Sequence, residues 1–398
     1  MSFDVNAIYD KPLSFLIGSG ASFGLLPTLA LNVTWADGTA HSIETLATYY
    51  EQQEDKKRYT ALFMHYYDRC IRPAQQMSFE AIRNDPARAS VQANYERFIR
   101  AVLTLLQRRR GVDRRCNVFT TNYDGCLPEA ANRITLDGGQ DFVVNDGSRG
   151  FFRRVVEARN YNTYLTRTGI FERHRQTVPQ INIINLHGSV YWSRHADQVH
   201  VTYNHDHLLD ASLVDEGMRD AVQAYWGQLD AGGPDTALPD APLTQAQMDA
   251  FWKAYRQLPI VNPTKWKFHE TVFEEHYYQM LRMLSFELER ENAVLITFGF
   301  SFADEHILNL VKRSLSNPQL MVFVTCFNET ENARLSAQFA DYANVVCVMA
   351  PDGNLTFDAF NALLSATNPP QGPWSGPPHD ACRRGHCRGR YQGHAPHR

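Results

Sequence analysis

The chain has 398 residues, of which 44% are hydrophobic and 21% charged, so it is long enough to bury one large core or two smaller ones. It has neither a run of about eighteen apolar residues nor a secretory signal, so we expect a cytoplasmic protein without a membrane segment. The formal net charge is −4, but residues 371–398 hold five Arg and one Asp, which leaves −8 on residues 1–370. That balance disfavours direct binding of nucleic acid.

Six short apolar runs, each bounded by Gly, Asn or Pro, have the composition of buried parallel strands. Helical patterns separate most of them, and this alternation predicts a doubly wound, Rossmann-like α/β fold with a mostly parallel sheet covered on both faces. The six runs are Leu13–Ile17, Asn117–Thr120, Ile181–Leu186, Val294–Phe298, Met321–Cys326 and Val345–Met349.

Three segments depart from this alternation. Residues 42–70 and 91–110 have helix-like spacing between the first two strands, which predicts a helical insertion over about 40–112. Acidic and amide residues and several prolines predict an irregular or helical excursion over about 192–258. After Pro369 almost nothing apolar remains, so we predict one domain over 1–369 and a disordered basic tail over 370–398.

The first strand runs into Gly18-Ser19-Gly20-Ala21-Ser22, a turn that we expect to open a helix. Such turns can cradle phosphates, because glycines let the backbone approach a pyrophosphate and the helix N-terminus supplies N–H groups. The pattern falls short of the full G-x-G-x-x-G fingerprint, and a glycine turn can serve packing alone. A G-x-x-x-x-G-K-[ST] loop is missing, which argues against a nucleoside triphosphatase.

Polar residues follow the next two predicted strands. One strand ends in Thr121-Asn122-Tyr123-Asp124 and the other in His187-Gly188. The carboxyl ends of parallel strands form the edge at which open α/β sheets bind ligands, and His187 is placed there as a proton acceptor. Each residue also has a structural interpretation, because Asn122 and Asp124 can cap a helix and a lone histidine often serves only the local structure.

Two later strands end in similar residues. One leads into Gly299-Phe300-Ser301-Phe302-Ala303-Asp304, where Asp304 is a candidate helix cap, and the other leads into Asn328, which can bind a ribose or begin a turn. Five strand ends that carry Gly, Ser, Asn, Asp and His thus converge on one predicted edge.

The cysteines do not form a recognisable metal module. Seven are scattered along the chain without a Cys-x-x-Cys pair, and their odd number argues against a disulfide framework. Cys382, His386, Cys387 and His394 offer metal-ligating atoms, but their spacing fits no zinc module. We therefore predict no metal site.

In this order, the segments resemble the sirtuin family over residues 13–330. Gly18–Ser22 resembles its G-A-G-x-S loop, Thr121–Asp124 its T-Q-N-I-D segment, and His187-Gly188 its catalytic H-G. Gly299-Phe300-Ser301 corresponds to its G-T-S, and Asn328 to the asparagine that holds the adenosine ribose.

The sequence departs from the sirtuin deacylases in two places. Their two Cys-x-x-Cys pairs are missing, because residues 188–298 hold no cysteine, so no zinc is expected. Their G-I-P-D-F-R is replaced by residues 24–28, Gly-Leu-Leu-Pro-Thr, so the Phe and Arg of that motif are not carried over. T-T-N-Y-D, L-H-G-S, Asn262-Pro263-Thr264-Lys265 and G-F-S-F-A-D-E-H resemble instead the zinc-less sirtuin-like domains of bacterial anti-phage systems.

That resemblance implies hydrolysis of NAD, the substrate, to nicotinamide and ADP-ribose, which depletes cellular NAD. It implies that Asn122 positions the ribose and a water while His187 accepts a proton. Asp304 would orient these groups or cap a helix. Asp124 would have the same role as Asp304. The remaining residues implied at the NAD site are Gly18, Ser19, Gly20, Ala21 and Ser22 at the pyrophosphate, Gly299, Ser301 and Asn328 at the adenosine half, and Thr121.

Three other interpretations stay open. An NAD-dependent protein deacylase would share the chemistry, but the zinc cysteines are missing. A non-catalytic NAD or ADP-ribose sensor would not need both Asn122 and His187, and a structural subunit with a vestigial edge predicts no thermal shift with NAD. Because constitutive NAD hydrolysis would poison the host, we expect activity to be gated by assembly or by a trigger. Domains that this chain resembles often work beside a HerA-like hexameric ATPase, a nuclease or an Argonaute, so a separate partner is one hypothesis and a large homo-oligomer is another.

Overall fold

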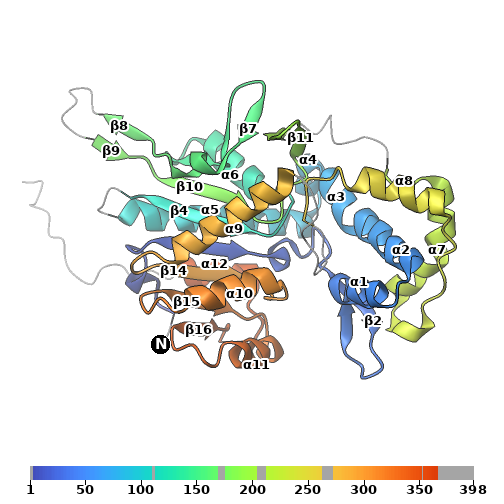
Figure 1. Ribbon diagram of the computed structural model, residues 1–398. Coiled ribbons are helices and arrows are strands. Elements are labelled where there is room, and N and C mark those ends of the chain that lie inside the picture. Colours follow the sequence, from blue (N-terminus) through green and yellow to red (C-terminus); the bar gives the residue numbers. More distant parts are fainter. Residues whose placement is uncertain are drawn as a thin grey trace, which may run out of the picture. The chain divides into compact units, whose positions relative to one another are not determined.

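A seven-stranded sheet, parallel at every pairing, forms the centre of the fold (Figure 1). The computed structural model describes residues 3–109, 113–168, 175–203, 212–261, 272–351 and 353–365. In spatial order the strands are β16 (Val345–Val348), β15 (Met321–Thr325), β14 (Val294–Phe298), β1 (Leu13–Ile17), β4 (Arg115–Thr120), β10 (Gln180–Asn185) and β5 (Val143–Asn145).

Successive side chains of each strand enter different cores on the two faces of the sheet. On β1, Phe15 and Ile17 pack into the larger core with Phe98, whereas Leu16 packs into the other core with Met280. Helices cover both faces (Figure 1). The larger core contains α5 (Pro86–Arg108), α6 (Cys126–Asp137) and α12 (Phe357–Ser365), and the other contains α9 (Val272–Leu288), α10 (Glu305–Ser314) and α11 (Glu329–Gln338).

The start of α5 follows from local chemistry. The Asp85 carboxylate accepts hydrogen bonds from the backbone N–H groups of Ala87 and Arg88, and Pro86 occupies the first helical position, where its missing N–H has no cost. Further along, apolar residues at helical spacing, among them Phe98 and Val102, are fully buried. The helix is thereby fixed against the sheet.

Two segments distant in sequence pack together beside the sheet. The first contains β2 (Ala30–Thr34), β3 (Ala40–Ser42), α1 (Ile43–Gln52), α2 (Lys56–Tyr66), a π-helical turn (Tyr67–Ile71), α3 (Arg72–Gln75) and α4 (Phe79–Arg83). The second contains α7 (Glu216–Ala231), β13 (Gly233–Pro234), a 3-10 turn (Asp235–Ala237) and α8 (Gln245–Tyr255). Contacts of α2 with α7 and α8, and pairing of β13 with β2, join the two segments.

Small antiparallel sheets complete the described structure. One contains β6 (Ser148–Arg149), β7 (Arg154–Val156), β11 (Trp192–His195) and β12 (Gln198–Val201), and a pair is formed by β8 (Thr166–Thr168) and β9 (Arg175–Thr177). Short 3-10 helices occur at Val5–Ala7, Ser19–Ser22 and Ala158–Asn162.

The doubly wound fold class is confirmed, with all six predicted strands in the central sheet. Helices also form in the predicted segments 42–70 and 91–110. The seventh strand, β5, was not predicted, because it is a three-residue edge strand that is only half-buried. Outside the described residues lie the predicted tail 370–398 with Cys382, His386, Cys387 and His394, and the segment Asn262–Lys265.

The strand order places a topological switch beside β1. The three strands of this sheet that next follow β1 in the chain all lie on one side of it, in the spatial order β4, β10, β5. The chain then returns to the other side of β1, where it forms β14, β15 and β16. At such a point the connections leave in opposite directions and open a crevice at the carboxyl ends of the strands.

Candidate functional site

Glycines interlock the turns that follow β1 and β14 at this switch point. The N–H of Gly18 donates to the carbonyl of Phe298 at 2.9 Å, and the N–H of Gly20 donates to the carbonyl of Gly299 at 3.0 Å. A Cβ on Gly18 would lie 2.4 Å from the Gly299 oxygen, and Gly299 itself has φ +62°. The glycines are therefore required by the close approach of two backbones.

The structure shows a further role for the glycines of the first turn and corrects the helix expected after it. The N–H groups of Gly18 and Gly20 donate to carbonyls of β14 and of the turn that follows it. The expected helix is only the four-residue 3-10 turn Ser19–Ser22, within which Ala21 is buried. Ser19 and Ser22 are the residues of this turn that line the cleft described next.

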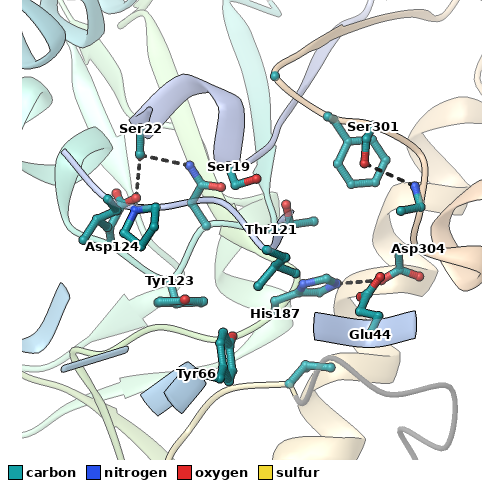
Figure 2. Close-up of a pocket in the computed structure, with 18 residues that line it drawn as sticks. Ser19, Ser22, Glu44, Tyr66, Thr121, Tyr123, Asp124, His187, Ser301 and Asp304 are labelled. Carbon is teal, nitrogen blue, oxygen red and sulfur yellow. Dashed lines mark hydrogen bonds and ion pairs between the residues drawn. The ribbon is translucent and has the colours of Figure 1, made fainter. Parts of the chain in front are cut away.

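A cleft lies over the carboxyl ends of β1, β4, β10 and β14 (Figure 2). Residues of the helical segment α1–α2 form part of its wall, among them Glu44 and Tyr66. The sequence-predicted residues that line it are Ser19, Ser22, Thr121, Asn122, Asp124, His187, Gly299, Ser301 and Asp304. Gly18, Gly20 and Ala21 lie in the turn beside the cleft, and Asn328 is not among its lining residues.

A buried hydrogen-bond network holds Asn122. Ser22 Oγ donates to Asp124 Oδ2 at 2.6 Å, and it accepts from Asn122 Nδ2 at 3.2 Å. Because the single hydrogen of Ser22 is directed at Asp124, the Tyr95 hydroxyl, 2.7 Å away, donates to Ser22. Burial, and next the Asp124 carboxylate, raise the pKa of Tyr95 well above its usual value, which keeps this donor protonated. The nitrogen of the Asn122 amide is thus fixed, and its carbonyl oxygen points the other way.

A carboxylate holds His187 on the opposite side of the cleft. Its Nε2 lies 2.9 Å from Asp304 Oδ2, and the two side chains are only 16% and 5% exposed (Figure 2). The other oxygen of Asp304 accepts from the N–H groups of His306 and Ile307, so Asp304 also caps α10. Asp304 therefore has both of the roles considered for it.

Steric crowding explains why a glycine follows His187. Gly188 has φ +84°, and a Cβ there would lie 2.0 Å from the carbonyl oxygen of Pro259. The Val261 N–H donates to the carbonyl of His187 at 2.9 Å, which ties the segment after α8 to the end of β10. Val261 also lines the cleft.

Asn328 is placed as a helix cap. Its Oδ1 accepts from the N–H of Glu331 at 2.9 Å at the start of α11. The sequence allowed Asn328 either to bind a ribose or to serve the local structure. The geometry shows the structural role, as a cap of α11. Asp124 likewise accepts from the N–H of Cys126 at 2.9 Å where α6 begins, in addition to its bond with Ser22.

A model of a SIR2-like domain matches residues 117–346, from β4 into β16 and so more than half of the chain. The chain belongs to the SIR2-like family. No curated protein matches the sequence. Proteins of this family are typically NAD-dependent, so the family indicates NAD as the ligand class.

Sequence reasoning missed three residues around this SIR2-like cleft: Glu44, Tyr66 and Tyr95. Glu44 and Tyr66 line the cleft, and Tyr66 forms a hydrogen bond with Tyr123 beneath it. Burial raises the pKa of both of these tyrosines well above the usual value, so both stay protonated. The sequence shows only helical segments here, in which a tyrosine at apolar spacing or an acid in a first turn is unremarkable.

Within the described residues of this SIR2-like chain, His, Cys, Asp and Glu side chains form no group of three that could hold a metal ion. Across the same residues, no helix is long and apolar enough to cross a membrane.

Proposed function

We propose that the chain hydrolyses NAD at the bond between nicotinamide and ribose, with Asn122 and His187 as the catalytic residues. The observation that carries this proposal is their placement on one cleft at the switch point of a SIR2-like fold, each held by a partner. Both side chains are mostly buried, so their orientations are defined before a ligand arrives.

The chemistry suits these two groups. Nicotinamide leaves NAD as a neutral molecule from a cationic ring, so the protein needs little acid catalysis and must instead stabilise an oxocarbenium-like ribose and place a water. The Asn122 carbonyl oxygen would accept from the water or a ribose hydroxyl. His187 would take the proton that the water loses when its oxygen bonds to the ribose carbon, and Asp304 would stabilise the resulting imidazolium.

The rest of the cleft would bind the remainder of NAD. The hydroxyls of Ser19 and Thr121 are donors suited to phosphate oxygens, and both residues line the cleft, on the turns that follow β1 and β4. Ser301 lines the side formed by the β14 turn, where we place the adenosine half. Asn328 is left out of this assignment because its side-chain oxygen caps α11.

The test is to incubate the purified chain with NAD and to quantify nicotinamide and ADP-ribose by chromatography. We expect Asn122→Ala and His187→Ala each to reduce cleavage by about 100-fold or more. His200→Ala on β12 and Asn332→Ala on α11 are matched controls outside the cleft and should retain activity. NAD that stays intact but raises the melting temperature would favour a sensor or a missing activating partner, and the assay is then repeated with candidate partners. NAD that stays intact with those partners as well would contradict hydrolysis, and no thermal shift would favour a vestigial site.

We further propose that this activity depletes NAD as the effector of a bacterial anti-phage system, together with a partner such as a HerA-like ATPase. The support is the motif resemblance over residues 13–330. Expression in bacteria, with and without the neighbouring genes, followed by measurement of NAD during phage infection, tests this role. Unchanged NAD in infected cells that carry the whole gene neighbourhood would refute it.

A further inference from the structure

Two phenylalanines are fully exposed at the tip of the hairpin that joins β6 to β7. Phe151 is 98% exposed and Phe152 is 104% exposed. Phenylalanine is normally among the most buried residue types, so an adjacent exposed pair indicates an interaction surface. Arg149 and Arg153 flank the pair and are also exposed. We call these residues, 149–153, the hairpin tip; it projects beside the β7 label in Figure 1.

The hairpin tip has a defined geometry. Antiparallel pairing sets Ser148 opposite Val156 and Arg149 opposite Val155. Gly150 has φ +119°, and a Cβ there would lie 2.1 Å from the carbonyl oxygen of Arg153, so only glycine allows the turn. The backbone thus presents the two rings outward.

A second cleft begins at the base of this hairpin. Arg154 lines it, directly after the hairpin tip, together with the rings of Phe79, Tyr191 and Tyr203. The cleft has a volume of roughly 760 Å³. Pockets of about 300–1,000 Å³ enclose drug-sized groups, so this cleft has room for the two phenyl rings of a hairpin.

The charges of this second cleft complement the hairpin tip. The cleft is lined by three acids and by two arginines, Arg83 and Arg154, so one negative charge is in excess. Of the acids, Asp146 is paired with Arg154 at 2.9 Å. Glu80 and Glu129 also line the cleft, and each lies in the first turn of its helix, α4 or α6. Aromatic rings beside carboxylates suit an arginine with its neighbouring phenyl groups.

We propose that the hairpin tip of one copy inserts into the second cleft of another copy of this chain. Arg154 joins the two features, since it follows the hairpin tip in sequence and lines the cleft. A hairpin tip adjacent to its complementary cleft allows two copies to exchange contacts reciprocally about a twofold axis. Four phenylalanine rings would bury about 600–1,000 Å² by themselves. With the matching cleft surface this reaches the range of about 1,200–2,000 Å² that is typical of specific interfaces.

The second cleft adjoins the turn that carries Asn122. A Cβ on Gly125 would lie 2.5 Å from the Tyr191 hydroxyl, and the Val190 N–H donates to the carbonyl of Tyr123 at 3.0 Å. A partner pressed against the Tyr191 ring therefore bears on the segment 121–125. Control of catalysis by assembly follows from this contact, and that consequence rests on the proposed function, whereas the interface itself does not.

The experiment uses the full chain and measures its mass by sedimentation velocity over a range of protein concentrations. We expect a dimer for the wild type and loss of the dimer in Phe151→Ser/Phe152→Ser. Two charge-reversal variants sharpen the test: Arg149→Glu/Arg153→Glu in the hairpin tip, and Glu80→Lys/Glu129→Lys in the cleft. Each variant alone meets like charges at both contacts and should be monomeric, whereas their equimolar mixture should restore the dimer because both contacts regain opposite charges.

Melting temperatures check that these surface variants fold. A monomeric wild type, a Phe151→Ser/Phe152→Ser dimer as tight as the wild type, or a mixture that stays monomeric would each overturn the proposal. Binding of the monomeric wild type to anionic lipid vesicles, lost in the phenylalanine variant, would assign the hairpin tip to membranes instead. These results do not depend on NAD cleavage, so they separate failure of the interface from failure of the proposed function.

Discussion

Replacing Ser22 with alanine tests whether the buried network orients Asn122. Ser22 Oγ is bonded to three side chains, those of Tyr95, Asn122 and Asp124, and all of them are at most 8% exposed. Ser22→Ala removes the shared oxygen without adding volume. The Asp124 carboxylate, the Asn122 amide and the Tyr95 phenol then each lose a hydrogen-bond partner at a buried site where water does not easily replace it.

The magnitude follows from the bonds lost. A hydrogen bond to a buried charged group contributes about 1.5–3 kcal/mol and a neutral one about 0.5–1.5 kcal/mol, and Ser22 makes one of the first kind and two of the second. Allowing for local relaxation, we expect Ser22→Ala to lower the free energy of unfolding by about 3 kcal/mol. Tyr95→Phe removes the bond to Ser22 and a longer one of 3.4 Å from Asn122, both neutral, and should cost about 1–2 kcal/mol.

Urea unfolding and steady-state NAD cleavage provide the two readouts. Because the amide of Asn122 loses its anchor, kcat should fall in Ser22→Ala by more than KM rises. Ser14→Ala is the matched control, since Ser14 is a buried serine of β1, the strand that precedes the turn of Ser22, and lies outside the network. If Ser22→Ala unfolds like Ser14→Ala, or keeps the kcat of the wild type, the network does not position Asn122 and the reasoning fails.

Three further changes test other parts of the site. Asp304→Asn keeps a residue that caps helices well but removes the charge facing His187. We expect kcat to fall roughly tenfold or more with little change in melting temperature, and a kcat equal to that of the wild type would refute a role for the carboxylate. Gly188→Ala forces a Cβ against the carbonyl of Pro259 at positive φ and should cost more than about 2 kcal/mol in urea unfolding, and a smaller loss would show that the loop yields. Burial lowers the pKa of His276 from 6.5 to about 4. Below pH 6.5 the unfolded chain therefore binds a proton that the folded chain does not, and the free energy of unfolding should drop by about 2 kcal/mol between pH 7 and pH 5 through this residue. His276→Leu should remove that part of the pH dependence, and an unchanged slope would contradict it.

The central sheet was predictable because a parallel strand that is buried on both faces consists of consecutive apolar residues. Each of the six predicted runs became a strand, with ends that differ by two residues at most. The short antiparallel strands were not predictable in the same way: β6 and β7 span two and three residues and are only partly buried, so they have no apolar run to reveal them.

The candidate site was predictable where it lies at strand ends and not elsewhere. Asn122 and His187 follow β4 and β10, and parallel strands bring such positions to one edge. Tyr95 lies in the middle of α5, where an aromatic residue at apolar spacing is typical of a core. Whether Gly18 approaches a phosphate or another backbone depends on the partner strand, which the spacing of glycines does not encode.

The interlocked glycine turns connect the two side chains that we propose as catalytic. Asn122 is oriented by Ser22, which follows β1, and His187 is oriented by Asp304, which follows β14, so each orienting residue belongs to a different turn. Backbone hydrogen bonds from Gly18 and Gly20 to Phe298 and Gly299 fix these two turns against each other. The relative position of Asn122 and His187 is therefore set through the glycines rather than through direct contact. In the proposed mechanism, the glycine turns would therefore support catalysis by holding the two halves of the site in register.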